Sequence, residues 1–152
     1  MAYVGVVGPS DASSDELGAV EALGRGLAER GHVVVCGGLG GVMSAVSRGA
    51  AGVGGTVVGL LPGTDRGEAN PFVTVALPTG LGELRNALLV RSSDVVVSVG
   101  GSWGTLSEVA LAVRTGVPVV AVGGWPIPSP GEGPTQVSSV DEALLLVDRL
   151  LG

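Results

Sequence analysis

The sequence predicts a single α/β domain over residues 1–152: a Rossmann-like, doubly wound parallel sheet of about seven strands with helices on both faces. Three observations predict it. Short valine-rich runs recur along the chain, as expected for parallel strands that are buried on both faces. Segments of helical period separate these runs. Glycine-rich turns follow several of them, at the edge of such a sheet where ligands bind.

The expected strands are short apolar runs bounded by glycine, proline or polar residues that favour turns. They lie at residues 4–7, 32–36, 56–61, 72–77, 95–99, 117–122 and 135–137. The expected helices have apolar residues at helical spacing and lie at residues 14–30, 44–51, 80–93, 105–115 and 140–151. The first and the last begin with capping-box pairs, Ser13 with Glu16 and Ser139 with Glu142.

The stretch at 94–111 is the most informative part of the chain. A β-branched strand at 95–99 runs into a turn at 100–104 that contains three glycines, and Thr105 then opens a helical pattern. A strand, a glycine turn and a helix start leave several backbone N–H groups unpaired, at the positive end of the helix dipole. This arrangement favours a phosphate-sized anion. Its simpler interpretation is a tight turn without a ligand.

Composition excludes several classes of partner. The net charge is -6 and the pI is near 4.6, so the overall field repels nucleic acids and anionic membranes. Aromatic residues make up 3% of the chain, too few for a base-stacking platform. No apolar run is long enough to span a membrane, and the first residues lack the basic start of a secretory signal. We therefore expect a cytoplasmic protein that binds neither nucleic acid nor membrane.

Residue counts exclude several kinds of chemistry. The single cysteine, Cys36, excludes an internal disulfide. Because the chain also has a single histidine, His32, we expect no metal site. All eight basic residues are arginine, so Schiff-base chemistry and the usual P-loop, which both need lysine, are excluded. A nicotinamide cofactor is also disfavoured. The first strand is followed only by Gly8-Pro9-Ser10, and a ribose-binding carboxylate is absent from the end of the second.

Several motifs resemble a known superfamily. The residues Gly100-Gly101-Ser102-Trp103-Gly104-Thr105-Leu106-Ser107-Glu108 resemble the Pro-Gly-Gly-x-Gly-Thr-x-x-Glu signature of the Lonely Guy cytokinin-activating phosphoribohydrolases, once labelled lysine decarboxylases. The chain is more similar still to bacterial relatives of the molybdenum cofactor carrier proteins. That similarity rests on Cys36-Gly37-Gly38, Gly41-Val42-Met43, Leu61-Pro62-Gly63, Thr79-Gly80-Leu81-Gly82, Arg85-Asn86 and the central turn.

The resemblance implies a seven-stranded Rossmann-like sheet, a homodimer or homotetramer, and a nucleotide or phosphorylated pterin bound at the glycine turns. In the hydrolases the catalytic pair is an arginine and a glutamate, which match Arg85 and Glu108 here. The phosphate- and nucleotide-binding residues that we expect come from three turns and one helix: Gly8, Ser10, Gly37, Gly38, Gly40, Gly41, Arg85, Gly100, Gly101, Ser102, Gly104 and Thr105.

Three of these residues also have structural interpretations. Thr105 and Glu108 have capping-box spacing, so Glu108 is either a helix cap or a group facing a ribose ring. Arg85 is either a surface charge or the cationic partner of a phosphate. Ser10 either donates to the ligand or begins the lead-in to the first helix.

Two functions fit these residues. The first is a binding protein that carries or protects a nucleotide monophosphate or a molybdopterin-type ligand and requires no other cofactor. In it the amides of Gly101, Ser102, Gly104 and Thr105 hold the phosphate, and the glycines at 38–41 let the ligand lie close. The second is a nucleoside 5′-monophosphate phosphoribohydrolase that releases a free base and ribose 5-phosphate. In it Glu108 stabilises the positive charge that develops on the ribose.

Overall fold

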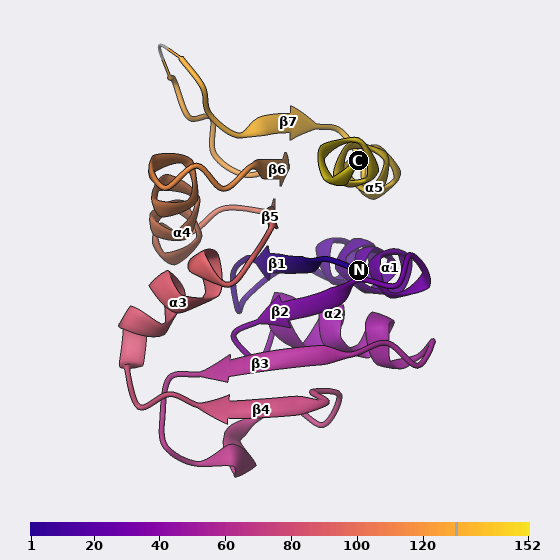
Figure 1. Ribbon diagram of the computed structural model, residues 1–152, viewed down its shortest axis with the longest axis vertical. Helices are drawn as coiled ribbons and strands as arrows, with labels where there is room; N and C mark the ends of the chain where they lie inside the picture. The colour runs from indigo at the N-terminus through magenta and orange to yellow at the C-terminus, as the bar shows by residue number, and fades with distance from the viewer. Residues whose placement is uncertain (130) are drawn as a thin grey trace.

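Seven parallel strands form one sheet in the computed structural model, which describes residues 1–129 and 131–152. Their order across the sheet is β4-β3-β2-β1-β5-β6-β7 (Figure 1). The strands are β1 (Tyr3–Val7), β2 (Val33–Cys36), β3 (Val57–Leu61), β4 (Val75–Pro78), β5 (Val95–Val99), β6 (Val119–Val122) and β7 (Thr135–Val137). The predicted α/β fold class is therefore confirmed.

Helices cover both faces of the sheet (Figure 1). The helices α1 (Ser14–Glu29), α2 (Val42–Ala51) and α5 (Val140–Leu151) pack on one face, where Val4, Val6 and Val97 belong to the larger apolar core. The helices α3 (Arg85–Arg91) and α4 (Trp103–Arg114) pack on the other face, over a smaller core that includes Val96. Successive valines of one strand thus enter opposite cores, because side chains alternate along a strand.

The strand order reverses between β1 and β5. The chain builds β1 to β4 outward to one edge, returns to pair β5 with β1, and then builds outward to β7 at the other edge. The connections that leave the carboxyl ends of β1 and β5 therefore diverge, to α1 on one face and to α4 on the other. A crevice opens at such a switch point, and ligands of open α/β sheets bind there.

Several predicted boundaries differ from those in the structure, and the largest differences are at the fourth strand and the third helix. The fourth strand begins at Val75 rather than at 72, because Phe72 N–H donates to Asn70 Oδ1 within a turn. Residues 80–84 are not α-helical. Gly80 and Gly82 have φ of 66° and 57°, and a short 3₁₀ turn, η2 (Gly82–Leu84), precedes α3. Helix α4 begins at Trp103, two residues before the predicted start.

Two glycines let α1 and α2 touch through their backbones. A Cβ on Gly24 of α1 would collide with the carbonyl oxygen of Val46, and a Cβ on Gly49 of α2 would collide with that of Glu21. Gly18, in the same helix α1, has nothing within 4 Å of its Cβ position. A methyl group would therefore collide with the neighbouring helix at Gly24 or Gly49 but not at Gly18.

We predict that Gly24→Ala lowers the free energy of unfolding by about 1–3 kcal/mol, because the methyl group forces the two helices apart. The matched change Gly18→Ala should raise it by about 0.5–1 kcal/mol through helix propensity alone. Urea denaturation measures both. Equal effects of the two substitutions would show that the close approach of the helices does not contribute to stability.

Candidate functional site

A cavity of about 200 Å³ lies at the switch point, and we call it the central cavity. It is bounded by the turn after β1, the first residue after β2, and the facing sides of α3 and α4. Its lining residues are Val6, Val7, Gly8, Pro9, Ser10, Gly37, Met43, Arg85, Asn86, Leu89, Ser102, Gly104, Thr105 and Glu108. Eight of the predicted site residues are thus brought together: Gly8, Ser10, Gly37, Arg85, Ser102, Gly104, Thr105 and Glu108.

Arg85 is fixed at the carboxyl ends of two strands. As the first residue of α3 it reaches across the sheet edge, where its Nη1 donates to the carbonyl oxygens of Gly37 and Leu60, each at 2.7 Å. A side chain on Gly37 would collide with this nitrogen. Burial lowers the pKa of Arg85, and the attraction of Glu108 opposes that shift. Arg85 is therefore a positioned cation in the lining of the cavity and not a free surface charge.

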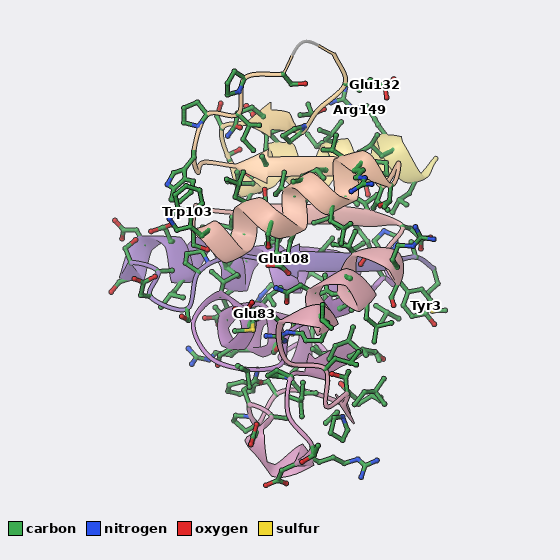
Figure 2. All side chains as sticks on the ribbon, turned by 90° about the vertical axis from the view of Figure 1, so that its left-hand side faces the viewer. Tyr3, Glu83, Trp103, Glu108, Glu132 and Arg149 are labelled. Atoms are coloured by element: carbon green, nitrogen blue, oxygen red, sulfur yellow. The ribbon has the colours of Figure 1, made fainter. Side chains whose placement is uncertain are left out.

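Glu108 is the sixth residue of α4 and lies on the side of that helix nearest α3 (Figure 2). Burial raises the pKa of its carboxyl to about 7, and Arg85 acts in the opposite direction. In the described part of the chain these two side chains line the same cavity without forming an ion pair. A carboxyl that titrates near neutrality beside a fixed cation can exchange a proton with a ligand.

The glycine turn between β5 and α4 ends in a serine cap. Ser102 Oγ accepts a hydrogen bond from the Thr105 N–H at 3.1 Å and lies 2.9 Å from Thr105 Oγ1. Ser102 is therefore the N-cap, and the interpretation of Glu108 as the partner of a Thr105 cap is wrong. The Thr105 amide is occupied within the turn, so its expected role as a phosphate donor does not fit this geometry.

Other amides of this turn differ in their availability. Gly100 N–H donates to Val122 O at 3.1 Å and is also occupied. The N–H groups of Trp103 and Gly104 are the first two of α4 and have no acceptor among the residues that the structure describes. They lie at the positive end of the helix dipole, where an anion is stabilised.

The remaining predicted glycines lie outside the central cavity. Gly38, Gly40 and Gly41 do not line it; Gly41 approaches the backbone of Ser10 closely, and Val42 N–H donates to Pro9 O at 3.3 Å. The glycines after β2 therefore hold two loops together. Gly100 and Gly101 line a second cavity of about 150 Å³, which we call the outer cavity, between α4 and the ends of β5, β6 and β7.

Sequence reasoning missed some of the lining residues. Leu89 lines the central cavity, but nothing separates it from ordinary core residues in the sequence. Met43 also lines it and belongs to the Gly41-Val42-Met43 motif, although it is not among the expected site residues. Trp125 lines the outer cavity and lies in the glycine- and proline-rich loop after β6, which carries no motif. Trp103 lies at the start of α4 (Figure 2) and is 78% exposed. It packs edge-to-face on Trp125, with ring centroids 4.9 Å apart.

Two features are absent from the residues that the structure describes. Within residues 1–129 and 131–152, no three histidine, cysteine, aspartate or glutamate side chains gather as a metal site would require. No described helix is both long enough and apolar enough to cross a bilayer.

Comparison with known proteins identifies relatives over almost the whole chain. The model of the SLOG cluster4 family matches residues 1–146. The molybdenum cofactor carrier protein of Chlamydomonas reinhardtii has a TM-score of 0.92 and 34% identity, covering 99% of both chains. The molybdenum cofactor binding protein of Rippkaea orientalis has a TM-score of 0.91 and 31% identity, covering 99% of this chain and 98% of that one.

A curated relative is an enzyme by its name. A probable cytokinin riboside 5′-monophosphate phosphoribohydrolase of Oryza sativa is 36% identical over 103 residues. These residues are 66% of this chain and 42% of the rice protein, so the similarity spans less than half of that protein.

The raised pKa of Glu108 predicts a pH-dependent stability. The folded protein holds this proton up to about pH 7, whereas the unfolded carboxyl releases it near its ordinary value of 4.5. The free energy of unfolding should therefore fall as the pH rises through this interval, by about 2–3 kcal/mol between pH 5 and pH 8. In Glu108→Gln that decline should be absent.

Urea denaturation at several pH values measures this difference. Glu83→Gln, which neutralises an exposed glutamate of η2, is the matched control and should keep the wild-type pH profile. A decline of equal size in Glu108→Gln and wild type would contradict the prediction.

Proposed function

The chain belongs to the SLOG cluster4 family, and we propose that it binds a small phosphorylated ligand across the turns at the carboxyl edge of its sheet. The ligand is a nucleotide or a phosphorylated pterin of the molybdenum cofactor type. The observation that carries the proposal is the position of Arg85. This partly buried cation is fixed in the central cavity, which the first turn of α4 also lines. The resemblance drawn from the sequence motifs is confirmed at the level of the family.

The polar groups around the cavity suit a phosphate. Arg85 uses Nη1 for two carbonyl groups, so Nε and Nη2 have no partner among the described residues and can donate to a ligand oxygen. The Trp103 and Gly104 amides supply further donors. Because the whole chain carries a charge of -6, only such local donors can hold an anion.

Known relatives support a molybdenum cofactor as one ligand to test. Two of the similar structures are, by their names, a binding protein and a carrier protein for that cofactor. A phosphate group of such a ligand would lie against Arg85 and the α4 amides. Gly8 and Gly37 line the same cavity, and protein atoms fill the space that a side chain would need at each: Val42 and the Val99 carbonyl at Gly8, and Arg85 at Gly37.

A second candidate function is phosphoribohydrolase activity, which the position of Glu108 favours. Hydrolysis adds water across the bond between ribose and base, breaks that bond, and leaves a proton to be placed on the departing base. A carboxyl with a pKa near 7 can hold and transfer such a proton, and as a carboxylate it stabilises positive charge on the ribose. The named activity of the rice relative supports testing this reaction.

The proposal includes a homodimer or homotetramer. Leu81, Leu84 and Leu88 of η2 and α3 are 46%, 72% and 40% exposed and form an apolar strip beside the site. Such a strip in a protein of this size is typical of an interface. Sedimentation equilibrium gives the assembly mass, and a monomer at high concentration would exclude this part of the proposal.

We predict that AMP raises the melting temperature of the wild type, because a ligand that binds only the folded state stabilises it. At a hundredfold excess over Kd the stabilisation is about 2.7 kcal/mol. Arg85→Met should weaken AMP binding by about tenfold or more, since a charge-assisted hydrogen bond is lost. The control Arg66→Met changes an exposed arginine of η1 and should bind as the wild type does. Equal binding by both variants would contradict the proposed site.

For the hydrolase, we predict that wild-type protein releases adenine from AMP, and that Glu108→Gln slows release by about 10²–10⁴-fold while AMP still binds. Chromatography of the free base measures the rate, and calorimetry measures binding. Absence of adenine at high protein concentration would remove the hydrolase and leave the binding function in place.

A further inference from the structure

The outer cavity lies beside the central cavity, on the far side of the turn at 100–105. Its floor is formed by one residue from each of three strands, Ser98 of β5, Ala121 of β6 and Gln136 of β7. One wall is the side of α4. The outer cavity thus lies at the same carboxyl edge of the sheet as the central cavity, over strands β5, β6 and β7.

Ser98 is a polar exception in β5, a strand in which all five residues are buried. It interrupts the run Val95-Val96-Val97-Ser98-Val99, is 4% exposed, and lines the outer cavity. Its hydroxyl has no hydrogen-bond partner among the described residues. In this part of the chain every fully enclosed side-chain nitrogen or oxygen atom has a hydrogen-bond partner, so the Ser98 hydroxyl is not fully enclosed. The hydroxyl therefore opens into the cavity. A hydroxyl that faces a cavity without a protein partner can donate to a ligand atom there and accept from one.

The walls of the outer cavity suit a flat ring. Leu106 and Val109 of α4 form one apolar side, and the Trp125 indole forms another. The indole packs against Gly101 so closely that a Cβ there would lie 2.8 Å from its Cδ1. Polar groups lie at the edge, since Gln136 Nε2 donates to Gly123 O at 3.0 Å and leaves its amide oxygen free to accept. Apolar faces with a polar edge are what an aromatic heterocycle requires.

The size of the cavity agrees with this class of ligand. A volume of about 150 Å³ matches that of a cavity able to hold one benzene-sized ring. It is too small for a complete nucleotide, so we expect it to take only part of a ligand.

The two cavities share the wall that carries the anion-binding donors. Ser102 and Thr105 line both of them, and the free amides of Trp103 and Gly104 lie at the same helix start. From this juxtaposition we propose that the outer cavity binds a planar aromatic ring of a ligand whose phosphates lie on the turn at 100–105. The ligand class is then a dinucleotide, with two nucleosides joined by a diphosphate and a ring-bearing half in each cavity. This inference rests on the proposed function.

Calorimetric titration with AMP and with diadenosine diphosphate tests the inference. The wild type should bind the dinucleotide between about five and a hundred times more tightly than AMP, the range expected for a base stacked on an aromatic side chain. Trp125→Ala should remove most of this advantage by removing the stacking surface. Ser98→Val should also reduce it, because this change replaces the hydroxyl with apolar methyl groups like those of the flanking valines.

Ser92→Val is the matched control, because Ser92 is exposed at the end of α3 and lines neither cavity. It should retain the full advantage of the dinucleotide. A wild type that binds AMP and gains nothing from the second nucleoside would overturn this inference alone. A wild type that binds neither compound would overturn the proposed function with it.

Discussion

The site depends on one constraint, a cation held on the carboxyl ends of two strands. A guanidinium that leaves water needs acceptors for its N–H groups, and the carbonyl groups of Gly37 and Leu60 supply them for Nη1 of Arg85. Those carbonyls belong to the ends of β2 and β3, so the register of the sheet fixes the charge in space. Position 37 must therefore be glycine, because any larger residue would displace the guanidinium. Strand pairing, the glycine turn and the electrostatics of the cavity are thus parts of one arrangement.

Glu108 gains its significance from this fixed cation. An ionised carboxylate beside a phosphate would repel it, but burial raises the pKa of Glu108 to about 7, so near neutrality the group is protonated for about half of the time. Bringing a phosphate into the same cavity favours the protonated form further. In the proposed function, Arg85 would attract the phosphate and Glu108 would change its charge when the ligand binds. An ion pair between them would have fixed both charges and lowered the pKa of Glu108.

Much of the fold and part of the site could be predicted from the sequence, since both depend on local patterns. Valine-rich strands, capping pairs and glycine turns define the α/β order, and the turn at 100–104 lies where a parallel sheet places its ligands. The sequence could not show that Gly80 and Gly82 adopt positive φ and delay the third helix, or that Ser102 rather than Thr105 caps the fourth. The first outcome depends on a distant residue, Pro62, whose carbonyl accepts from Gly82 N–H. The second is a choice between two nearby hydroxyl residues that are both preferred at N-cap positions.

Glycine-rich turns also show why motif reading overestimates a site. Gly41 is required because the backbone of Ser10 occupies the space of a side chain, and Gly38 because Leu61 and the backbone of Gly59 do. Both glycines serve the packing of loops, and neither lines the central cavity. The more informative signal is a polar residue where the pattern demands an apolar one. Ser98 stands among four valines in a strand buried on both faces, and its unpartnered hydroxyl opens into the outer cavity. Because glycine serves packing and binding equally, a polar residue in a buried apolar strand is the more specific reason to propose a ligand site.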